Sequence, residues 1–407
     1  MRHCVLVLAA AALLAGCGGA EPPAQPPADT GYAATLHQKL LDAKAGDVIE
    51  IPAGRFGFDR SLVLRASGVT IRGAGIDKSV LTFKGQKAGA EGLLVNGDDF
   101  AIENLTIEDS KGDGLKISES KNITIRGVKV QWTGGPSTKN GAYGLYPVKT
   151  TNVLIEDCVA IAASDAGIYV GQSKDVIVRR SRAEYNVAGI EIENTINADV
   201  YDNVATNNTG GILVFNMPAL SQQGGQIRVY KNKIVDNNTD NFGAKGTPVA
   251  SVPAGSGMVV NSNDDVEIFD NDIANNRTAN IIISSVYSTG YKDSSMAKDF
   301  DPYPERIYVY GNRFTGGGDS PDGVDLKALR IATMGLTGSF PDVLWDGYFN
   351  KDRQVDGQPA PGPQICLDNV SGVVNADGPH GYDNPNTDIA PFRCSLPKLP
   401  PIDLKRA

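Results

Sequence analysis

The dominant pattern of the chain is a short apolar run that begins with glycine and recurs at a nearly fixed interval. Within each run, apolar residues that would face a core alternate with residues that would point outward, as in Gly167-Ile-Tyr-Val and Gly189-Ile-Glu-Ile. Alternation over so few residues predicts β-strands rather than helices. A self-similar period of about 22 residues predicts a solenoid. The runs begin at Gly92, Gly114, Gly144, Gly167, Gly189, Gly211 and Gly257, and Asn280 closes the series.

Each period also holds two further alternating runs, such as Val176-Ile-Val, with short polar turns between them. Three short strands per period are typical of one coil of a β-helix, and the Leu and Asn spacing of a leucine-rich repeat is absent. Parallel crossovers are right-handed in nearly all proteins. The sequence therefore predicts an all-β fold, a right-handed parallel β-helix with three-strand coils over residues 33–315. A column of mostly small polar residues near the second strand is predicted to hydrogen-bond from coil to coil: Asn104, Cys158, Ser181, Asn203, Asn232, Asn271 and Asn312.

Both ends of such a stack need a cap. Ala33–Ala45 has Leu36 and Leu40 near one face, which predicts an amphipathic N-terminal cap helix. Residues 316–407 are rich in Gly and Pro, and we expect them to form an irregular C-terminal capping region. Cys366 and Cys394 lie there, and in an exported protein we predict a disulfide between them, with two free thiols as the alternative.

The N-terminus has the pattern of an export signal. A short apolar stretch ends in Leu14-Ala15-Gly16-Cys17, which resembles the lipobox of bacterial lipoproteins. We therefore predict a signal peptide over residues 1–16, lipidation of Cys17, and a flexible tether over 17–32. The lipid would be the only contact with the membrane, and Gly18 favours the outer membrane of the cell envelope. An ordinary signal peptide with a chance cysteine is the alternative.

Composition removes several classes of function. The formal net charge is -9 and no basic run is present, which argues against nucleic acid as a partner. Histidine occurs only at His3, His37 and His380, so no histidine triad or histidine metal site is expected. Asp264-Asp265 lacks the other residues of an EF-hand loop and is interpreted as a turn. No motif indicates a cofactor or a metal, and Ca²⁺ is left open.

Four insertions interrupt the period next to the glycine-led strands: residues 131–143, 217–225, 239–256 and 284–305. Because all four flank the same predicted sheet, we expect that sheet to form the floor of a groove. Strand alternation places two rows of side chains in it. The first row is Lys116, Tyr146, Tyr169, Glu191, Leu213 and Val259; the second is Ser118, Gly171, Glu193, Phe215 and Asn261.

Tyrosine rings beside Lys, Glu and Asn suit a polysaccharide or oligosaccharide, because rings stack on sugars and polar groups bind hydroxyls. The alternative is an ordinary solvated sheet face. The predicted substrate-binding residues are Lys116, Tyr146, Asp165, Tyr169, Gln172, Asn194 and Asn216.

Three residues are candidates for catalysis. Glu191 and Glu193 point to the same face of their strand, and the rise per residue places them roughly 7 Å apart. This spacing is compatible with an inverting glycosidase. Lys149 would turn outward if the register slipped by one at Pro147, and it could then act as the base of a lyase or epimerase. Asp113 is placed with Asp165 at the edge of the groove. Whether the protein is an enzyme is left open.

Several quoted runs carry a family resemblance. Asn140-Gly-Ala-Tyr-Gly-Leu-Tyr-Pro-Val and Asn186-Val-Ala-Gly-Ile-Glu-Ile-Glu-Asn resemble the parallel β-helix repeat lipoproteins of proteobacteria, within the pectate-lyase-like superfamily. The resemblance covers about residues 47–313. It implies no assigned activity, and it implies a gene partner that encodes an exported c-type cytochrome. No catalytic motif of pectate lyases, polygalacturonases or mannuronan epimerases is matched.

Two functions follow as hypotheses. The first is an envelope lipoprotein that binds, and in one version cleaves or modifies, a polysaccharide along the groove. The second is a non-catalytic envelope scaffold that docks a protein partner such as that cytochrome.

Overall fold

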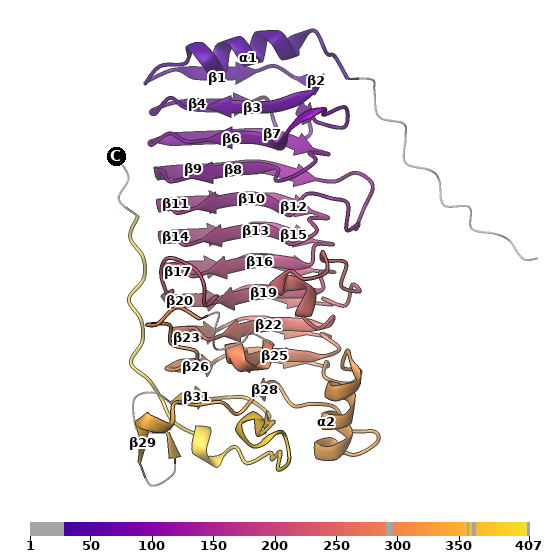
Figure 1. Ribbon diagram of the computed structural model, residues 1–407, viewed down its shortest axis with the longest axis vertical. Coiled ribbons are helices and arrows are strands. Elements are labelled where there is room, and N and C mark those ends of the chain that lie inside the picture. The colour runs from indigo at the N-terminus through magenta and orange to yellow at the C-terminus, as the bar shows by residue number, and fades with distance from the viewer. Residues whose placement is uncertain (1–27, 290–295, 356–357, 360–363, 405–407) are drawn as a thin grey trace, which may run out of the picture.

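The computed structural model describes residues 28–289, 296–355, 358–359 and 364–404, and it shows a tall stack of coils (Figure 1). Each coil contributes three strands, and equivalent strands of successive coils pair in parallel. This confirms the parallel β-helix. The predicted leader 1–16 and the lipidation site Cys17 lie outside the described residues. Among the residues that are described, no helix has the length and apolar character needed to cross a membrane.

The glycine-led strands form one continuous sheet, called here the glycine-led sheet. In stacking order it contains β3 (Arg60–Leu64), β6 (Ala88–Val95), β8 (Leu115–Ser118), β10 (Tyr143–Val148), β13 (Ala166–Gly171), β16 (Ala188–Glu193), β19 (Gly210–Phe215), β22 (Ser256–Asn261), β25 (Ala279–Ser284), β28 (Val343–Trp345) and β32 (Val373–Asn375).

The other two strands of each coil belong to a second sheet, because they merge into single bent strands at β7 (Phe100–Glu108) and β9 (Lys121–Gln131). Its first column continues with β1 (Val48–Ile51), β4 (Thr70–Gly73), β11 (Thr151–Glu156), β14 (Lys174–Arg179), β17 (Ile196–Tyr201), β20 (Gly225–Tyr230), β23 (Asp264–Phe269), β26 (Ile307–Tyr310) and β31 (Ile365–Leu367). Its second column contains β2 (Gly54–Gly57), β5 (Ser79–Thr82), β12 (Val159–Ile161), β15 (Arg182–Glu184), β18 (Val204–Thr206), β21 (Lys233–Val235), β24 (Asp272–Ala274) and β27 (Arg313–Thr315).

The core is built from aligned columns of inward side chains. Ile168, Ile190 and Ile212 pair in register across β13, β16 and β19, and each is fully buried. The glycine that precedes each of them is needed because the coils approach closely: a Cβ at Gly189 would lie 2.5 Å from the carbonyl oxygen of Gly211. The alternation seen in the sequence is therefore the alternation between core and groove.

The polar column inside the turns is confirmed from Cys158 to Asn312. Asn232 shows the repeating unit: its Nδ2 donates to Asn271 Oδ1 at 2.9 Å, and its Oδ1 accepts from Asn203 Nδ2 at 3.0 Å. The placement of Asn104 was wrong, because Asn104 is exposed in a left-handed turn (φ 58°) and the buried Leu105 takes the column position. A second, unpredicted ladder lies before the glycine-led strands and contains Asn186, Asn208, Asn237 and Asn276.

The N-terminal cap is present and differs slightly from its prediction. The helix α1 spans Tyr32–Asp42, and Leu36 and Leu40 are buried against the first coil. The ordered body begins before residue 33, since Asp29 N donates to Arg55 O at 2.7 Å. The predicted tether is thus too long at its C-terminal end.

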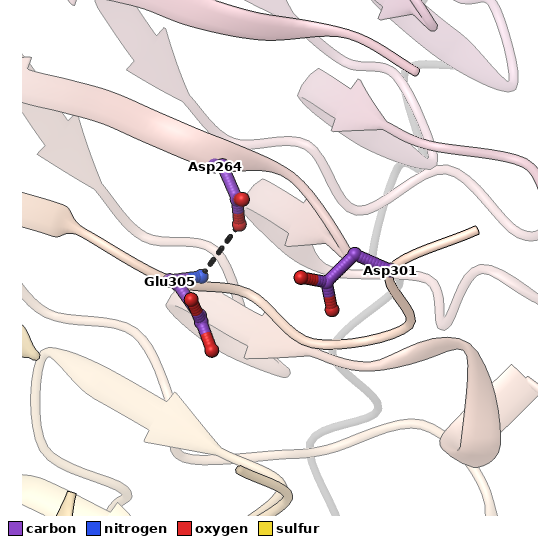
Figure 2. A group of neighbouring side chains, drawn as sticks. All are labelled: Asp264, Asp301 and Glu305. Atoms are coloured by element: carbon purple, nitrogen blue, oxygen red, sulfur yellow. Dashed lines mark hydrogen bonds between the residues drawn. The ribbon is translucent and has the colours of Figure 1, made fainter. Parts of the chain in front are cut away.

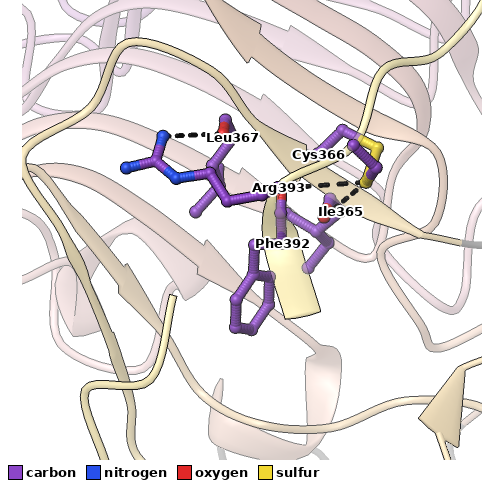
Figure 3. Close-up of a disulfide and its surroundings, with 6 residues drawn as sticks. Ile365, Cys366, Leu367, Phe392 and Arg393 are labelled. Atoms are coloured by element: carbon purple, nitrogen blue, oxygen red, sulfur yellow. Dashed lines mark hydrogen bonds between the residues drawn. A yellow bond between two sulfur atoms is a disulfide. The ribbon is translucent and has the colours of Figure 1, made fainter. Parts of the chain in front are cut away.

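The C-terminal region also departs from prediction, because it adds β28, β31 and β32 to the two sheets instead of only covering them. Other elements there are α2 (Val324–Met334), a small hairpin of β29 (Gln354–Val355) and β30 (Gln358–Pro359), and the short 3-10 turns η4 (Lys351–Arg353), η5 (Gly378–His380) and η6 (Ala390–Phe392). The predicted disulfide between Cys366 and Cys394 is confirmed and joins β31 to the segment after η6 (Figure 3). The chain then runs back along the stack (Figure 1), where Ile402 N donates to Asp199 Oδ2.

Candidate functional site

The four insertions flank the glycine-led sheet as expected. Residues 131–143 lead into β10 and 239–256 into β22, while 217–225 follow β19 and 284–305 follow β25. One of them closes part of the predicted groove: around the 3-10 turn η1 (Pro248–Ser251), Val249 and Val252 pack with Leu213, which is fully buried. The groove floor is therefore divided into an upper polar part and a lower apolar part.

Three tyrosine rings form the centre of the upper part. Tyr143, at the end of an insertion, lies 4.5 Å from Tyr146 and 4.4 Å from Tyr169, measured between ring centroids. Lys116 Nζ sits 4.8 Å from the centroid of Tyr146, a cation–π contact that covers one face of this ring. Tyr146 and Lys116 are half-buried, so both can still contact a ligand.

Tyr169 holds the cluster together instead of presenting its ring to a sugar. Only 4% of this residue is exposed, and its hydroxyl donates to Glu193 Oε1 at 2.6 Å. The ring lies across Gly171, where a Cβ would meet the Tyr169 hydroxyl oxygen at 2.3 Å. The expected stacking of Tyr169 on a sugar was therefore wrong, because the ring is covered.

Four carboxyl groups surround these rings: Asp113, Asp165, Glu191 and Glu193. Burial raises the pKa of Asp165 to about 7, and the nearby Glu193 carboxylate adds to the rise while a Tyr143 hydrogen bond opposes it. Burial likewise raises the pKa of Asp113 to about 6, against the pull of Lys116 at 3.8 Å. The cluster therefore holds groups that change charge near neutral pH.

Glu191 lies deepest in this cluster. It is 3% exposed, and its Oε2 has no hydrogen-bond partner among the described residues. Burial raises its pKa well above the ordinary value, and the Asp165 and Glu193 carboxylates raise it further. Glu193 is half-buried, and its pKa is raised by burial and lowered by the Tyr169 hydroxyl. Glu191 and Glu193 therefore share a face as predicted, but they differ in access.

Lys149 does not face the groove. β10 stays in register with β8 through Val148, which takes the outward position beside Ser118. Lys149 follows in a left-handed turn (φ 53°), with its side chain half exposed and its Nζ 3.9 Å from Glu119 Oε1. The register slip that would have made Lys149 a candidate base does not occur, and this prediction is corrected.

The three predicted amide ligands are structural. Asn194 and Asn216 are buried, and their side chains bond the backbone of the insertion 217–225, for example Met217 N to Asn194 Oδ1 at 2.8 Å. Gln172 Oε1 accepts from Ser221 Oγ at 2.7 Å in the same insertion. In the structure these three polar side chains anchor the insertion 217–225.

The lower part of the groove is an apolar cleft of about 730 Å³. Phe215, Val259 and Ile282 of the sheet form its floor, and Leu326 and Leu329 of α2 form one wall. Asp322, Asp325 and Asp346 also line this cleft, and Ser285 N and Ser288 Oγ donate to the Asp346 carboxylate. This cleft was not predicted from the sequence, because the helix α2 that forms its wall was not predicted.

Comparison with known proteins agrees with this architecture. Residues 62–219 match the family model described as right handed beta helix region. This protein is a right-handed parallel β-helix. The A-module of the mannuronan C-5 epimerase AlgE4 from Azotobacter vinelandii superposes with a TM-score of 0.50 at 17% identity, covering 77% of this chain and 89% of that chain. The polygalacturonase from Erwinia carotovora ssp. carotovora gives a TM-score of 0.51 at 13% identity, covering 74% and 96%.

A relative found by sequence is a pre-neck appendage protein of Bacillus phage B103. It is 27% identical over a match 440 positions long, gaps included, and the match covers 82% of this chain and 48% of that protein. The β-helix chain thus spans about half the length of this relative. At these identities the solved structures establish the fold, and the chemistry must be argued from the groove itself.

Proposed function

We propose that this β-helix is a glycan-binding protein whose upper groove hydrolyses a neutral or amino-sugar polysaccharide. The observation that carries the proposal is a cluster of four carboxyl groups whose pKa values are raised to different extents. The cluster lies beside half-buried tyrosine and lysine side chains. Glycoside hydrolysis needs one protonated and one ionised carboxyl group near the same bond. Polysaccharide-acting neighbours of the same fold support a carbohydrate ligand.

The charge of the cluster argues against a polyuronate. Within the described part of the chain, these four carboxyl groups (Asp113, Asp165, Glu191 and Glu193) make one ion pair, that of Asp113 with Lys116 at 3.8 Å. An epimerase or lyase must neutralise the substrate's own carboxylate, which in this groove would take Lys116 or a divalent cation held by the acids. Neutral or amino sugars need no such neutralisation. Hydrolysis is accordingly favoured over elimination or epimerisation.

Access assigns the roles within the cluster. Asp165 is partly exposed, and its pKa of about 7 lets it hold a proton at neutral pH, so it acts as the general acid. Burial raises the pKa of Glu193, but this residue is partly exposed and the Tyr169 hydroxyl bond opposes the rise, so we assign it as base or nucleophile. Glu191 is covered and acts as a positioning residue, and its carboxylate helps to raise the pKa of the Tyr143 and Tyr169 hydroxyls. Tyr146 and Lys116 contact the sugar.

The test combines binding to a glycan array with product analysis. The mature protein should shorten a bound neutral or amino-sugar polymer to reducing ends, and Asp165→Asn should retain binding while losing at least a hundredfold in rate. Glu119→Gln, at an exposed turn outside the cluster, is the matched control. Unsaturated products, or tight binding of polyuronates alone, would contradict the proposal.

We also propose that the mature protein is lipid-anchored at Cys17 in the outer membrane. The lipobox-like run Leu14-Ala15-Gly16-Cys17 supports this. Metabolic labelling with a palmitate analogue should mark the wild-type protein and not Cys17→Ser. Label that persists in the variant would place the lipid elsewhere.

The apolar cleft favours a second candidate function, docking of a protein partner such as an exported c-type cytochrome. Val324 and Leu336, at the two ends of the α2 segment, are 82% and 80% exposed. Exposed apolar side chains around a cleft often mark a protein contact. Val324→Asp should weaken recovery of an envelope partner by site-specific crosslinking without changing glycan binding. Equal recovery would remove this candidate.

A further inference from the structure

A second acidic cluster lies outside the groove, across the turn that joins β22 to β23. It is at the start of β23, a strand of the second sheet. Asp264 opens β23, and Asp301 and Glu305 come from the end of the insertion that precedes β26. Figure 2 shows the three carboxyl groups turned toward a shared space. One oxygen from each of these groups lies within 4.8 Å of the others. Such convergence is what a cation held by oxygen ligands requires.

An independent observation also points to a missing ligand. Glu305 is 2% exposed, and its Oε1 has no hydrogen-bond partner among the described residues. Its other oxygen, Oε2, is bound by the Arg353 and Arg306 guanidinium groups. Buried carboxylate oxygens are normally satisfied by a donor, a water or a metal ion. The free Glu305 oxygen therefore marks a place where a cation or a water is needed.

We propose that Asp264, Asp301 and Glu305 form a Ca²⁺ site. When all are ionised, these side chains and the adjacent Asp265 carry four negative charges, and Arg306 and Arg353 supply two positive ones. The excess of two negative charges equals the charge of one divalent cation. The donors are all hard oxygens, which excludes the sulfur and imidazole sets that favour zinc or copper.

The hydrogen bonds already present leave room for this role. Asp264 Oδ1 accepts from Glu305 N at 3.0 Å and Oδ2 accepts from Arg306 at 3.1 Å, and each oxygen keeps a further lone pair. Asp301 Oδ1 accepts from Tyr303 N at 3.1 Å. Ca²⁺ tolerates irregular sets of six to eight oxygens, whereas Mg²⁺ demands a near-octahedral one. The mixed, partly shared carboxylates therefore favour Ca²⁺, with water completing its shell.

The site would join two insertions beside the groove. Gln223, in the insertion 217–225, bonds the backbone of Asp301 twice, through Nε2 to the carbonyl at 3.1 Å and Oε1 from the amide at 3.0 Å. That same insertion is anchored to the upper groove by Asn194. Binding of Ca²⁺ between Asp264 and Asp301 would thus fix both insertions to the coil stack.

The experiment uses terbium, a luminescent substitute for Ca²⁺, on the full mature protein without glycan. Tyr303 follows Asp301 by two residues, and its ring lies 5.9 Å from that of Tyr287, so excited tyrosine can transfer energy to a bound ion. Emission should rise on adding terbium and fall on adding Ca²⁺. Calorimetry should show one Ca²⁺ per chain, and Asp301→Asn should weaken it at least tenfold. Asp299→Asn, an exposed acid of the same insertion, should leave it unchanged.

Three outcomes would overturn the proposal. These are no Ca²⁺-displaceable emission, equal affinity in Asp301→Asn, and displacement by Mg²⁺ as effective as by Ca²⁺. If Asp301→Asn and Glu305→Gln both fail to fold, Tyr303→Phe decides the question. This variant should lose most of the sensitised emission while calorimetry still finds one Ca²⁺. Unchanged emission in Tyr303→Phe would place the ion elsewhere. Because no glycan is used, failure here is distinct from failure of the hydrolase proposal.

Discussion

Replacing Asp165 by asparagine should stabilise the protein at neutral pH and leave it unchanged in acid. The pKa of Asp165 is raised from 3.8 to about 7 in the folded state by burial and by the Glu193 carboxylate. Between pH 3.8 and about pH 7 the folded state therefore binds a proton at Asp165 that the unfolded state has lost. Stability is therefore full below pH 4 and falls as the pH rises toward 7.

The size of the effect follows from the same shift. A rise of about three pKa units corresponds to ~4 kcal/mol at pH 8. Glu193 and Glu191 share the interaction, and either can take up part of the proton when Asp165 is ionised, so we expect ~2–4 kcal/mol for the single substitution. The carboxamide of asparagine is close in size to the carboxyl group. Little should therefore be lost in packing.

The assay is urea unfolding of the mature protein and of Asp165→Asn at half-unit steps from pH 4 to pH 8. The two midpoints should coincide at pH 4 and diverge steadily above pH 5, with the variant more resistant. Asp319→Asn, at an exposed acid in the C-terminal region, should follow the wild type throughout. The claim that burial of the ionised Asp165 costs stability would be refuted by either of two results. One is a lower urea midpoint for the variant than for the wild type at pH 8, and the other is the same change of midpoint with pH in both proteins.

Three further predictions concern the scaffold. Replacing Cys366 and Cys394 by serine should lower the free energy of unfolding by ~3.5 kcal/mol, because the disulfide closes a 28-residue loop, and thermal unfolding measures this loss. The denatured, unreduced mature protein should contain one reactive thiol, Cys158. Three reactive thiols would contradict the structure. Asn232→Ala leaves donors of Asn203 without a partner and should cost ~2–4 kcal/mol by urea unfolding, whereas the exposed Asn384→Ala should cost less than ~0.5 kcal/mol. Gly171→Ala should push the Tyr169 ring from Glu193 and lower the melting temperature by an amount worth ~1–3 kcal/mol, and an unchanged melting temperature would show that the ring can move freely.

Much of the fold could be predicted because it is local and repeated. The alternation in Gly167-Ile-Tyr-Val predicts which side chains face the core. The 22-residue spacing predicts that Gly189-Ile-Glu-Ile of the next coil lies beside this strand, as it does. The disulfide could also be predicted, since Cys366 and Cys394 share one region of a chain that the sequence predicts to be exported. Each of these inferences needs only neighbouring residues and a repeat.

The errors arose where distant segments decide the structure. β28, β31 and β32 were missed because long irregular stretches separate them, although Gly372 precedes Val373 of β32 as a glycine precedes the strands of the repeat. Asn104 was misplaced by one position, which a turn with a left-handed residue makes easy to do from sequence alone. Gln172, Asn194 and Asn216 have the polarity of a binding surface, but an insertion returns to bond them.

The division of the groove can be followed along one outward row of the glycine-led sheet. Lys116, Tyr146, Tyr169 and Glu191 are succeeded in register by Leu213, Val259 and Ile282. An apolar outward row on a solvated face would be costly, and the insertion 239–256 and α2 cover it. Covering the lower coils also buries Glu191, which pairs with Leu213 at the boundary, and this burial raises the pKa of Glu191. The apolar cover is therefore part of the acidic site: opening it by Val252→Asp should return the pKa of Glu191 toward its ordinary value and reduce the pH dependence of stability in the same urea unfolding assay.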